Sequence, residues 1–529
     1  MMNVFRFHAC YWLLLLLLYS EGFSAEQEQP PNIVFFLVDD LGWSDVACYG
    51  SELYETPNID KLAAEGVRFT SAYAACHVCS PTRASILTGK YPGRTGVTDW
   101  ISGRRNFAFQ KLLNVPPAQH LPYEEITLAE TLQEHGYRTG IVGKWHLGSG
   151  PSGPKAHGFD DQVPRWTGGV ARTFHAPFRL GGLEGPAGEY LTDRLTDEAL
   201  KFIRANRSGP FFLYMSHFAV HDPIQGREDL VAKYRKKLAA MPRSERPPYI
   251  LEGNPDAAGP LSRETLTGML DDQKYEGYRV LPDQTVRIKQ HQDNVQFAAM
   301  VESVDESLGR IVDELETLGL GDNTIVIFFS DNGGMSGMNL GNPHRRVGRQ
   351  QLDRAFSTSN LPLRGAKGWL YEGGIREPLI VKWAGQENAG AVCDVPVIST
   401  DFYPTLLELA GLPPLPKQHV DGVSLVPLLK GQKQLDREAI YWHFPHYSNH
   451  GMQSPGGAVR SGDFKLLEYY ERGTVQLFNL KTDLGEQNDL AKSQPAKADQ
   501  LRKMLHAWRQ RVSAKMMMPN PNYDPSKYP

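Results

Sequence analysis

Two long apolar runs, each followed directly by carboxyl or amide side chains, constrain the fold of this chain most strongly. The run over residues 32–38 precedes Asp39 and Asp40, and the run over residues 324–330 precedes Asp331 and Asn332. Continuous apolar runs of this length predict strands buried on both faces, in a parallel or mixed sheet between helices. Because ligands of such sheets gather at the carboxyl ends of the strands, we expect these four polar residues in one site.

Helix and strand patterns alternate through the first 330 residues. Periodicity and end signals predict helices over 57–65, 127–136, 191–206 and 293–318, and strands over 137–143 and 209–216. This order predicts an α/β domain with a mixed central sheet between helices, over residues 31–430. From about residue 431 the segments become short, aromatic and turn-rich, followed by a helix expected over 495–516. Residues 431–529 are therefore expected to form a smaller α+β domain with an antiparallel sheet.

The first 25 residues have the pattern of a secretory signal peptide. Arg6 precedes a Leu-rich apolar run from Ala9 to Tyr19, and small residues near Ala25 offer a cleavage site. The run is too short to span a membrane, although an uncleaved N-terminal anchor is the alternative. We therefore expect export to the periplasm, the medium or a lysosome, without stable insertion into a membrane.

Charge and cysteine content exclude further classes. The chain has 56 Lys and Arg residues against 60 Asp and Glu residues, a balance that argues against nucleic acid as a partner. Of the 5 cysteines, Cys10 lies in the signal segment, and the remaining four are too few for a disulfide scaffold. The sequence leaves the oligomeric state open.

The most specific motif is Cys79-Ser-Pro-Thr-Arg83, followed by Thr88-Gly89. It resembles the motif of the type I sulfatases, arylsulfatase-like members of the alkaline-phosphatase-like superfamily, whose motif cysteine is oxidised to formylglycine. The resemblance implies that Cys79 is modified by a formylglycine-generating enzyme, a transient partner, and that Arg83 assists it. Taken alone, Cys79 could be a buried or disulfide-bonded thiol in a helix N-terminal turn.

The four polar residues at the strand ends all offer hard oxygen ligands. Three carboxylates and an amide suit Ca²⁺ or Mg²⁺, although such residues also occur in turns and helix caps. The resemblance implies one divalent cation, Ca²⁺ rather than Mg²⁺. Its ligands would be Asp39, Asp40, Asp331, Asn332 and the modified Cys79.

A third set of residues is basic. Lys144 and His146 lie two apart in an extended segment and can face one ligand, and the resemblance adds Lys367 as a second sulfate-binding lysine. His221 matches the histidine that acts on the leaving group and contacts the substrate, with His217 as the second choice. Taken alone, the lysines could lie on the surface and the histidines could be structural.

The resemblance covers residues 31–490 and implies a mechanism. Hydrated formylglycine would attack sulfur, while the cation, Lys144 and Lys367 bind the sulfonate oxygens. His221, assisted by Lys367, would protonate the departing oxygen, and His146 would accept the proton that lets sulfate leave. Arg83 would orient the hydrated aldehyde.

Long segments between the motifs suggest the substrate class. Residues 160–189, 222–289 and 335–362, with the aromatic and histidine-rich stretch 441–447, are expected to rim the pocket. They contain Arg165, Trp166, Arg172, His175, Arg345 and Arg346. Stacking surfaces with scattered cations suit a sulfated carbohydrate. The alternatives are a small aryl sulfate, a phosphonate monoester or phosphodiester, and an inactive secreted binding protein.

We predict that the tryptic peptide over residues 69–83 carries the modification. In protein made with a formylglycine-generating enzyme, oxidation of the Cys79 thiol to an aldehyde should lower the peptide mass by about 18 Da. Mass spectrometry of the digest measures this directly. An intact thiol in every copy of the peptide would contradict the predicted nucleophile.

Overall fold

The computed structural model describes residues 30–257, 259–270, 285–337, 356–383, 388–450 and 453–527, so the expected signal peptide lies outside the described residues. The strands of its main sheet are β1 (Asn32–Val38), β2 (Val67–Tyr73), β4 (Arg138–Gly143), β5 (Asp161–Val163), β6 (Phe211–Ser216), β9 (Thr324–Ser330), β10 (Arg376–Lys382), β11 (Val392–Cys393) and β12 (Val397–Ile398). Their order is β11-β2-β10-β9-β1-β6-β4-β5, with β12 also paired to β2.

The expected mixed sheet is confirmed. β9, β1, β6, β4 and β5 run parallel to one another, whereas β10 is antiparallel to both β9 and β2. The register pairs Val38 with Ser330 and Leu37 with Ser216, so β1, β9 and β6 end at the same edge. The residues that follow these strands are therefore brought together.

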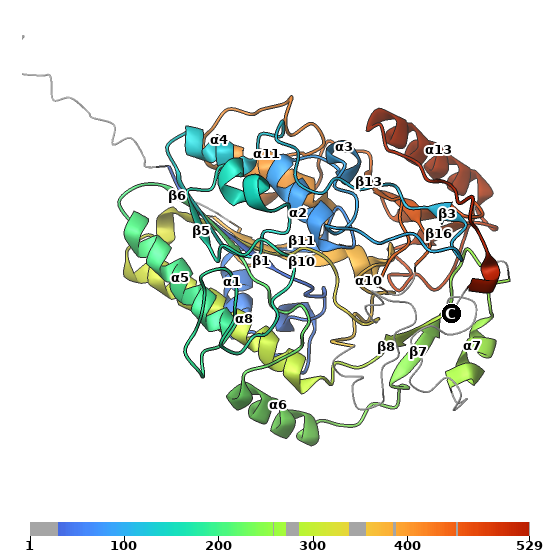
Figure 1. Cartoon of the computed structure of the whole chain (residues 1–529), viewed down its shortest axis with the longest axis horizontal. Helices are drawn as coiled ribbons and strands as arrows, with labels where there is room; N and C mark the ends of the chain where they lie inside the picture. The colour runs from blue at the N-terminus through green and yellow to red at the C-terminus, as the bar shows by residue number, and fades with distance from the viewer. Residues whose placement is uncertain are drawn as a thin grey trace, which may run out of the picture.

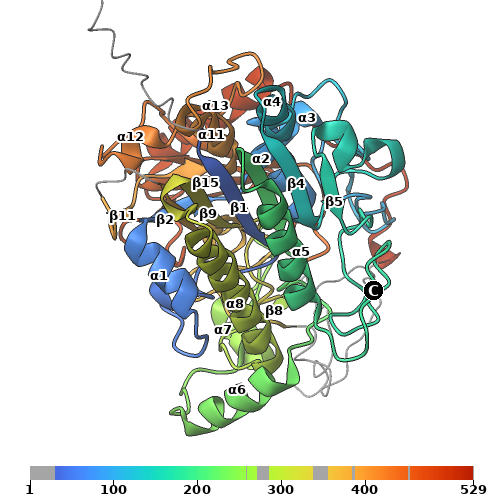
Figure 2. The same ribbon diagram turned by 90° about the vertical axis from the view of Figure 1, so that its left-hand side faces the viewer.

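Alternate residues of β1 enter two separate hydrophobic cores, which explains why its sequence is continuously apolar. Val34, Phe36 and Val38 pack in the core that includes residues of α1 (Pro57–Glu65), α5 (Leu191–Asn206) and α8 (Val295–Thr317). Ile33, Phe35 and Leu37 pack in the core that includes residues of α2 (Cys79–Thr88), α4 (Leu128–Glu134) and α11 (Phe402–Leu409). Figure 2 shows α1, α8 and α5 side by side across the face turned to the viewer.

The long helices lie close to the predicted ranges, and local signals explain where they begin. α1 starts at Pro57, where a missing N–H costs nothing because first-turn N–H groups have no partner within the helix. α8 follows Asn294, whose side chain accepts hydrogen bonds from the backbone of Gln296 and Phe297. No helix in the described part of the chain is both long and apolar enough to cross a membrane.

The expected antiparallel sheet near the C-terminus is also present (Figure 1), formed by β13 (Ile440–Phe444), β14 (Gly456–Ser461), β15 (Phe464–Tyr469) and β16 (Val475–Asn479). Helix α13 (Pro495–Arg511) packs against it. The helix was expected to reach residue 516 but ends earlier. Ser513 adopts a left-handed conformation (φ 52°), and the Ala514 N–H turns back to the Arg509 carbonyl.

This smaller sheet shares a hydrophobic core with the main body. Tyr73, Trp369 and Tyr371 lie in the same cluster of buried side chains as Trp442 of β13 and residues of β14, β15 and α13. The Trp442 indole N–H also donates to the Ala74 carbonyl at 2.8 Å. The sheet therefore lies directly against the segments that lead into the strand-end site.

The remaining α-helices and strand pairs lie between these elements or at the C-terminal end of the described residues. They are α3 (Pro92–Thr95), α6 (Glu228–Ala240), α7 (Arg263–Leu270), α10 (Glu372–Ile375), α12 (Val426–Leu429), and the strand pairs β3 (Leu112–Leu113) with β17 (Met518–Pro519) and β7 (Tyr249–Glu252) with β8 (Val286–Lys289). The cysteines in the described ranges are all free thiols: Cys48, Cys76, Cys79 and Cys393. Cys48 and Cys76 are therefore not bridged to each other.

A close approach between β4 and β6 fixes the start of the Lys144 segment. Gly143 ends β4 with φ 114°, and a Cβ there would lie 1.8 Å from the Ser216 carbonyl oxygen. That oxygen accepts a hydrogen bond from the Lys144 backbone N–H at 2.6 Å. Only glycine fits both the dihedral angle and the gap.

We predict that Gly143→Ala destabilises the protein. Forcing a Cβ into this gap should lower the free energy of unfolding by at least about 1–3 kcal/mol, as overpacking does elsewhere. Gly209→Ala is the matched control, because Gly209 also flanks a central strand, yet a Cβ there meets nothing within 4 Å. Denaturant midpoints measure both changes, and equal midpoints would contradict the steric argument.

Candidate functional site

The carboxyl ends of β1 and β9 bring together the polar residues that the sequence predicted there. Asp39, Asp40, Asp331 and Asn332 are all buried. The Asn332 side-chain amide donates to Asp40 Oδ1 at 2.8 Å, and the Asp40 backbone N–H lies 3.3 Å from Asp331 Oδ1. Asp40 has a positive φ of 63°, a conformation that Asp tolerates better than most residues. The two motifs therefore form one cluster, as expected.

Cys79 is the first residue of α2 and faces this cluster. Its Sγ and one carboxylate oxygen each from Asp39 and Asp331 lie within 4.8 Å of one another. The side chain is 3% exposed, and Lys367 Nζ lies 3.9 Å from the sulfur. The N-terminus of a helix favours negative charge, so this position suits an anionic or strongly polarised group.

Arg83 lies one turn along α2 and joins three elements. Its Nε donates to Asp331 Oδ2 at 2.8 Å, and Nη2 forms an ion pair with the same oxygen at 2.7 Å. Nη1 donates to Ser216 Oγ at 2.6 Å. Burial disfavours its charge, but the carboxylates of Asp331 and Asp39 outweigh this, so its pKa is raised. Arg83 is thus a buried, permanently charged contact between α2, β9 and β6.

The two lysines each pair with one carboxylate of the cluster. Lys144 Nζ donates to Asp39 Oδ2 at 2.7 Å, and Lys367 Nζ donates to both oxygens of Asp40 at 2.6 and 2.8 Å. Both ammonium groups are almost completely buried. Burial lowers the pKa of Lys367, but Asp40 chiefly, with further acidic groups, raises it above its usual value. Both cations therefore face the same small volume as Cys79.

The residues present fit a divalent cation. Asp39 Oδ1 and Asn332 Oδ1 are buried, and neither has a hydrogen-bond partner among the described residues. Burial raises the pKa of Asp39 well above its usual range, because its charge is poorly solvated there. Hard oxygens held by the protein in this way suit Ca²⁺ better than Mg²⁺, which retains more of its water. A bound divalent ion would offset two of the three carboxylate charges of the cluster.

His146 is held in one orientation beside the cluster. It lies at φ 57°, and its Nε2 is 2.8 Å from the Ile101 carbonyl oxygen. Burial first, and then the charge of Lys144, lowers the pKa of His146 well below its usual value, so the ring is neutral. A neutral ring that contacts a carbonyl through Nε2 carries its proton there, which leaves Nδ1 as the acceptor. Nδ1 is buried and has no partner within the described part of the chain.

His221 has the opposite protonation state. Its Nδ1 contacts the Asp222 carbonyl oxygen at 2.8 Å and a carboxylate oxygen of the same residue at 2.7 Å. Nε2 lies 3.6 Å from Asp40 Oδ2. Burial lowers the pKa of His221, but Asp40, Asp222 and Asp39 outweigh it and raise the pKa to about 9. His221 can therefore donate a proton through Nε2 at neutral pH.

His217, the second choice for this position, lies outside the cluster. Its Nε2 contacts Ser307 Oγ of α8 at 2.9 Å, and its ring packs against Phe36 of β1. Burial lowers the pKa of His217 to about 3. This histidine is a neutral core residue, so the structure favours His221.

Sequence reasoning missed Ser80 and Ser216. Ser80 Oγ donates to the His146 carbonyl at 2.8 Å and accepts from the Ile101 N–H at 3.1 Å, so it holds both partners of the histidine contact. Ser216 bonds Arg83, as described above. Ser216 could have been found as the polar residue that ends β6, but only three-dimensional contacts reveal Ser80.

Among the expected pocket segments, residues 160–189 reach the site. The His146 N–H donates to the Thr167 carbonyl at 3.1 Å, and a Cβ on Gly169 would collide with the His146 ring. Residues 345 and 346 lie outside the described residues.

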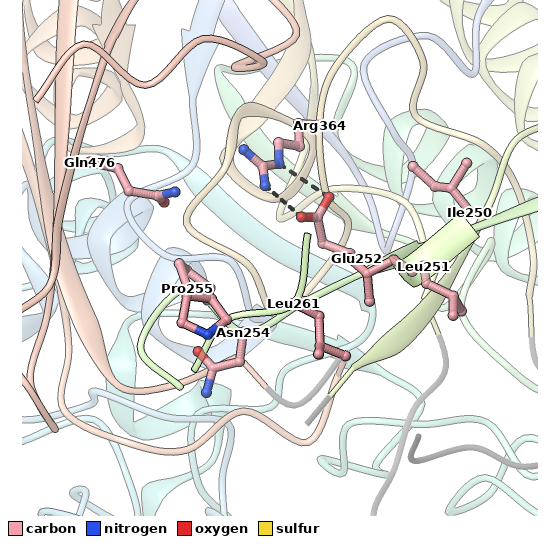
Figure 3. A pocket seen from close by; sticks show the side chains of 11 residues that line it. Ile250, Leu251, Glu252, Asn254, Pro255, Leu261, Arg364 and Gln476 are labelled. Carbon is pink, nitrogen blue, oxygen red and sulfur yellow. Dashed lines mark hydrogen bonds and ion pairs between the residues drawn. The ribbon is translucent and has the colours of Figure 1, made fainter. Parts of the chain in front are cut away.

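A separate cavity of about 280 Å³ lies beside β7 and is lined by Arg364 (Figure 3). Arg364 pairs with both carboxylate oxygens of Glu252, donates to the Glu486 carbonyl and stacks on Tyr371. Arg364 is therefore already paired, and Lys367 supplies the basic group of this segment to the cluster.

Comparison with known proteins agrees with this geometry. Residues 31–412 match the sulfatase family, and residues 366–515 match the C-terminal region of N-sulphoglucosamine sulphohydrolase. A sulfatase of Formosa agariphila is 30% identical over 94% of this chain and 92% of its own length. The N-acetylgalactosamine-6-sulfatase of Mus musculus is 32% identical over 81% of this chain and 72% of its own length. The crystal structure of Ps i-CgsB in complex with k-i-k-neocarrahexaose is similar with a TM-score of 0.68 and 27% identity, over 91% of this chain and 93% of that one.

The fold and these relatives define a sulfuric ester hydrolase of the alkaline-phosphatase-like fold. The chain belongs to the sulfatase family.

We predict that Ca²⁺ stabilises the protein through the strand-end cluster. After treatment with a chelator, added Ca²⁺ should raise the melting temperature, because binding to the native state at 100 times Kd adds about 2.7 kcal/mol. Asp39→Asn should reduce the shift, whereas Asp322→Asn, which changes an exposed residue after α8, should retain it. Differential scanning calorimetry measures the shift, and an equal response of both variants would refute this ligand assignment.

Proposed function

We propose that this chain is a secreted sulfatase that releases inorganic sulfate from a sulfated carbohydrate. In this proposal, Cys79 is converted to formylglycine and the strand-end cluster binds one Ca²⁺. The observation that carries it is the convergence of Cys79, Lys144 and Lys367 on one buried carboxylate cluster. A sulfate ester is anionic, so buried cations around a nucleophile position favour its binding and reaction.

When bound, Ca²⁺ would polarise oxygens in the site, and formylglycine would supply the oxygen nucleophile. Lys144 and Lys367 then bind the sulfate oxygens and offset the charge that develops on them. Their present partners, Asp39 and Asp40, are also the proposed metal ligands. Each lysine is thereby held at the position where the sulfate would lie.

The two histidines divide the proton transfers. His221 holds a proton on Nε2 because its pKa lies above neutrality, and it donates this proton to the departing alcohol oxygen. His146 is neutral with Nδ1 free to accept, so it removes a proton from the nucleophile side. Opposite protonation states at one pH suit a general acid and a general base. Arg83 holds α2 against Asp331 through its ion pair.

A carbohydrate is favoured over a small aryl sulfate by the relatives. The mouse relative is named as an N-acetylgalactosamine-6-sulfatase, and the solved structure of Ps i-CgsB holds k-i-k-neocarrahexaose. The expected signal segment favours an extracytoplasmic location. In this proposal residues 31–430 form the catalytic domain and residues 431–529 form the smaller C-terminal domain. Modification would require transient binding of a formylglycine-generating enzyme.

We predict that Cys79→Ala abolishes sulfate release without unfolding the protein. Removal of the nucleophile should lower turnover at least about 1,000-fold, as it does in other enzymes with a covalent nucleophile. Cys393→Ala is the matched control, since Cys393 is a half-buried free thiol on β11. Release of sulfate, measured by ion chromatography, and circular dichroism test both variants.

The substrate is tested with a panel that separates the alternatives. It comprises N-acetylgalactosamine 6-sulfate, glucosamine 2-N,6-O-disulfate, a carrageenan oligosaccharide, 4-nitrophenyl sulfate and phenyl phosphonate. The proposal expects the highest kcat/KM for one of the saccharides. Preference for phenyl phosphonate would favour a phosphonate monoester hydrolase, and activity on 4-nitrophenyl sulfate alone would refute a carbohydrate substrate. Turnover by Cys79→Ala at the wild-type rate would refute the assignment of Cys79 as the source of the nucleophile.

A further inference from the structure

The loop between β13 and β14 reaches the strand-end site from the smaller sheet. We call residues 445–455 the β13–β14 loop; residues 451 and 452 lie outside the described residues. None of its residues is among the acid, base or metal groups discussed above. Its polar side chains are nevertheless buried, which calls for a physical reason.

The β13–β14 loop packs directly on the segment that carries Lys367. A Cβ on Gly368 would lie 2.4 Å from both Ser448 Oγ and His450 Cβ, so the two segments are in contact. The Leu370 backbone N–H donates to Gln453 Oε1 at 2.5 Å. Within the loop, Ser448 Oγ donates to the His450 carbonyl and accepts from its N–H. These bonds fix His450 next to Lys367.

A second set of contacts fixes the loop against the segment before Cys79. The rings of His77 and Phe444 are 4.2 Å apart, and Phe444 also packs against His446. His446 Nε2 contacts Thr98 Oγ1 at 2.9 Å, and Arg104 donates to the Ser448 carbonyl. The loop is therefore held from two sides, by the segment that carries Lys367 and by the segment that contains Thr98 and Arg104.

Four described side chains of this loop have a buried polar atom without a hydrogen-bond partner in the described ranges, and two of them, Asn449 and His450, are adjacent. His450 is 5% exposed and Asn449 is 7% exposed. His450 Nδ1 and Asn449 Oδ1 are buried without a hydrogen-bond partner in the ranges that the structure describes. An unpaired buried polar atom is costly, so unpaired atoms on two adjacent side chains indicate groups kept for a ligand.

The charges around His450 place it near the groups proposed to act on the ester. Lys367, Asp40, His221 and Asp222 all act electrostatically on its ring. Burial, and after it the charge of Lys367, lowers the pKa of His450 well below its usual value. The ring is therefore neutral, with one donor and one acceptor, and has no net attraction for a sulfate anion.

We propose that His450 and Asn449 form a subsite for the alcohol part of the ester, in which they bind hydroxyl or acetamido groups of the sugar that bears the sulfate. This inference rests on the proposed function and adds the residues that recognise the sugar. A neutral imidazole and an amide each offer a donor and an acceptor, as a sugar hydroxyl requires. Lys144 and Lys367 bind the sulfate, and His450 and Asn449 of the β13–β14 loop bind the sugar to which the sulfate is attached.

The test compares a saccharide with a substrate that lacks hydroxyl groups. Steady-state kinetics of His450→Ala and Asn449→Ala are measured on the best saccharide sulfate of the panel and on 4-nitrophenyl sulfate. A site whose polar group is left unpaired discriminates strongly, so we expect kcat/KM for the saccharide to fall about 10–100-fold. For 4-nitrophenyl sulfate, which offers no hydroxyl to the loop, we expect less than about a threefold change.

Two further variants separate recognition from folding. His450→Gln keeps a donor and an acceptor and should recover part of the saccharide activity. His506→Ala is the matched control, because His506 lies on α13 with its side chain 47% exposed and contacts Glu468. Thermal melting of every variant checks the fold. If His450→Ala fails to fold, Asn449→Ala and His450→Gln carry the comparison.

Each outcome is decisive. A fall in kcat/KM for the saccharide sulfate alone supports the subsite. An equal fall in kcat/KM for both substrates, or no fall for either, overturns the subsite while leaving the proposed sulfatase function intact. If the wild-type protein hydrolyses only 4-nitrophenyl sulfate, the carbohydrate part of the proposed function fails, and the subsite fails with it.

Discussion

The structure depends on a set of opposite charges packed together out of contact with water. Asp39 pairs with Lys144, Asp40 with Lys367, and Asp331 with Arg83. Each of these charges would be costly to bury alone, and removal of one partner leaves the other uncompensated. The pairs join β1, β9, the end of β4, α2 and the segment before α10. The site is therefore a property of the whole sheet edge rather than of a single loop.

Much of this arrangement could be predicted from the sequence. The apolar runs over 32–38 and 324–330 predict two central strands, and their parallel pairing brings Asp39 and Asp331 together. The closeness of Lys367 to Asp40 could not be predicted in this way, because it depends on how the chain returns after a long excursion. The fit of Gly143 against Ser216 and the unpaired atoms of His450 also depend on packing between distant segments. No local pattern encodes such contacts.

His217 and His221 show why a residue type alone does not define a role. They are four positions apart, yet burial in the core lowers the pKa of His217, whereas three nearby carboxylates raise that of His221. His146 differs again, since a carbonyl contact selects its tautomer. The sequence identified the candidates, and only the surrounding charges distinguish acid, base and core residue.

The shared core of the two sheets restricts when the Cys79 side chain can be reached by another protein. Cys79 is 3% exposed in the folded chain, so another enzyme could not reach it there. The core around Trp369 and Tyr371 is completed by β13–β16 and α13, which follow Cys79 far along the chain. Without these segments the core around Trp369 and Tyr371 lacks part of its packing. If Cys79 is modified as proposed, the modification would therefore have to precede the completion of this core.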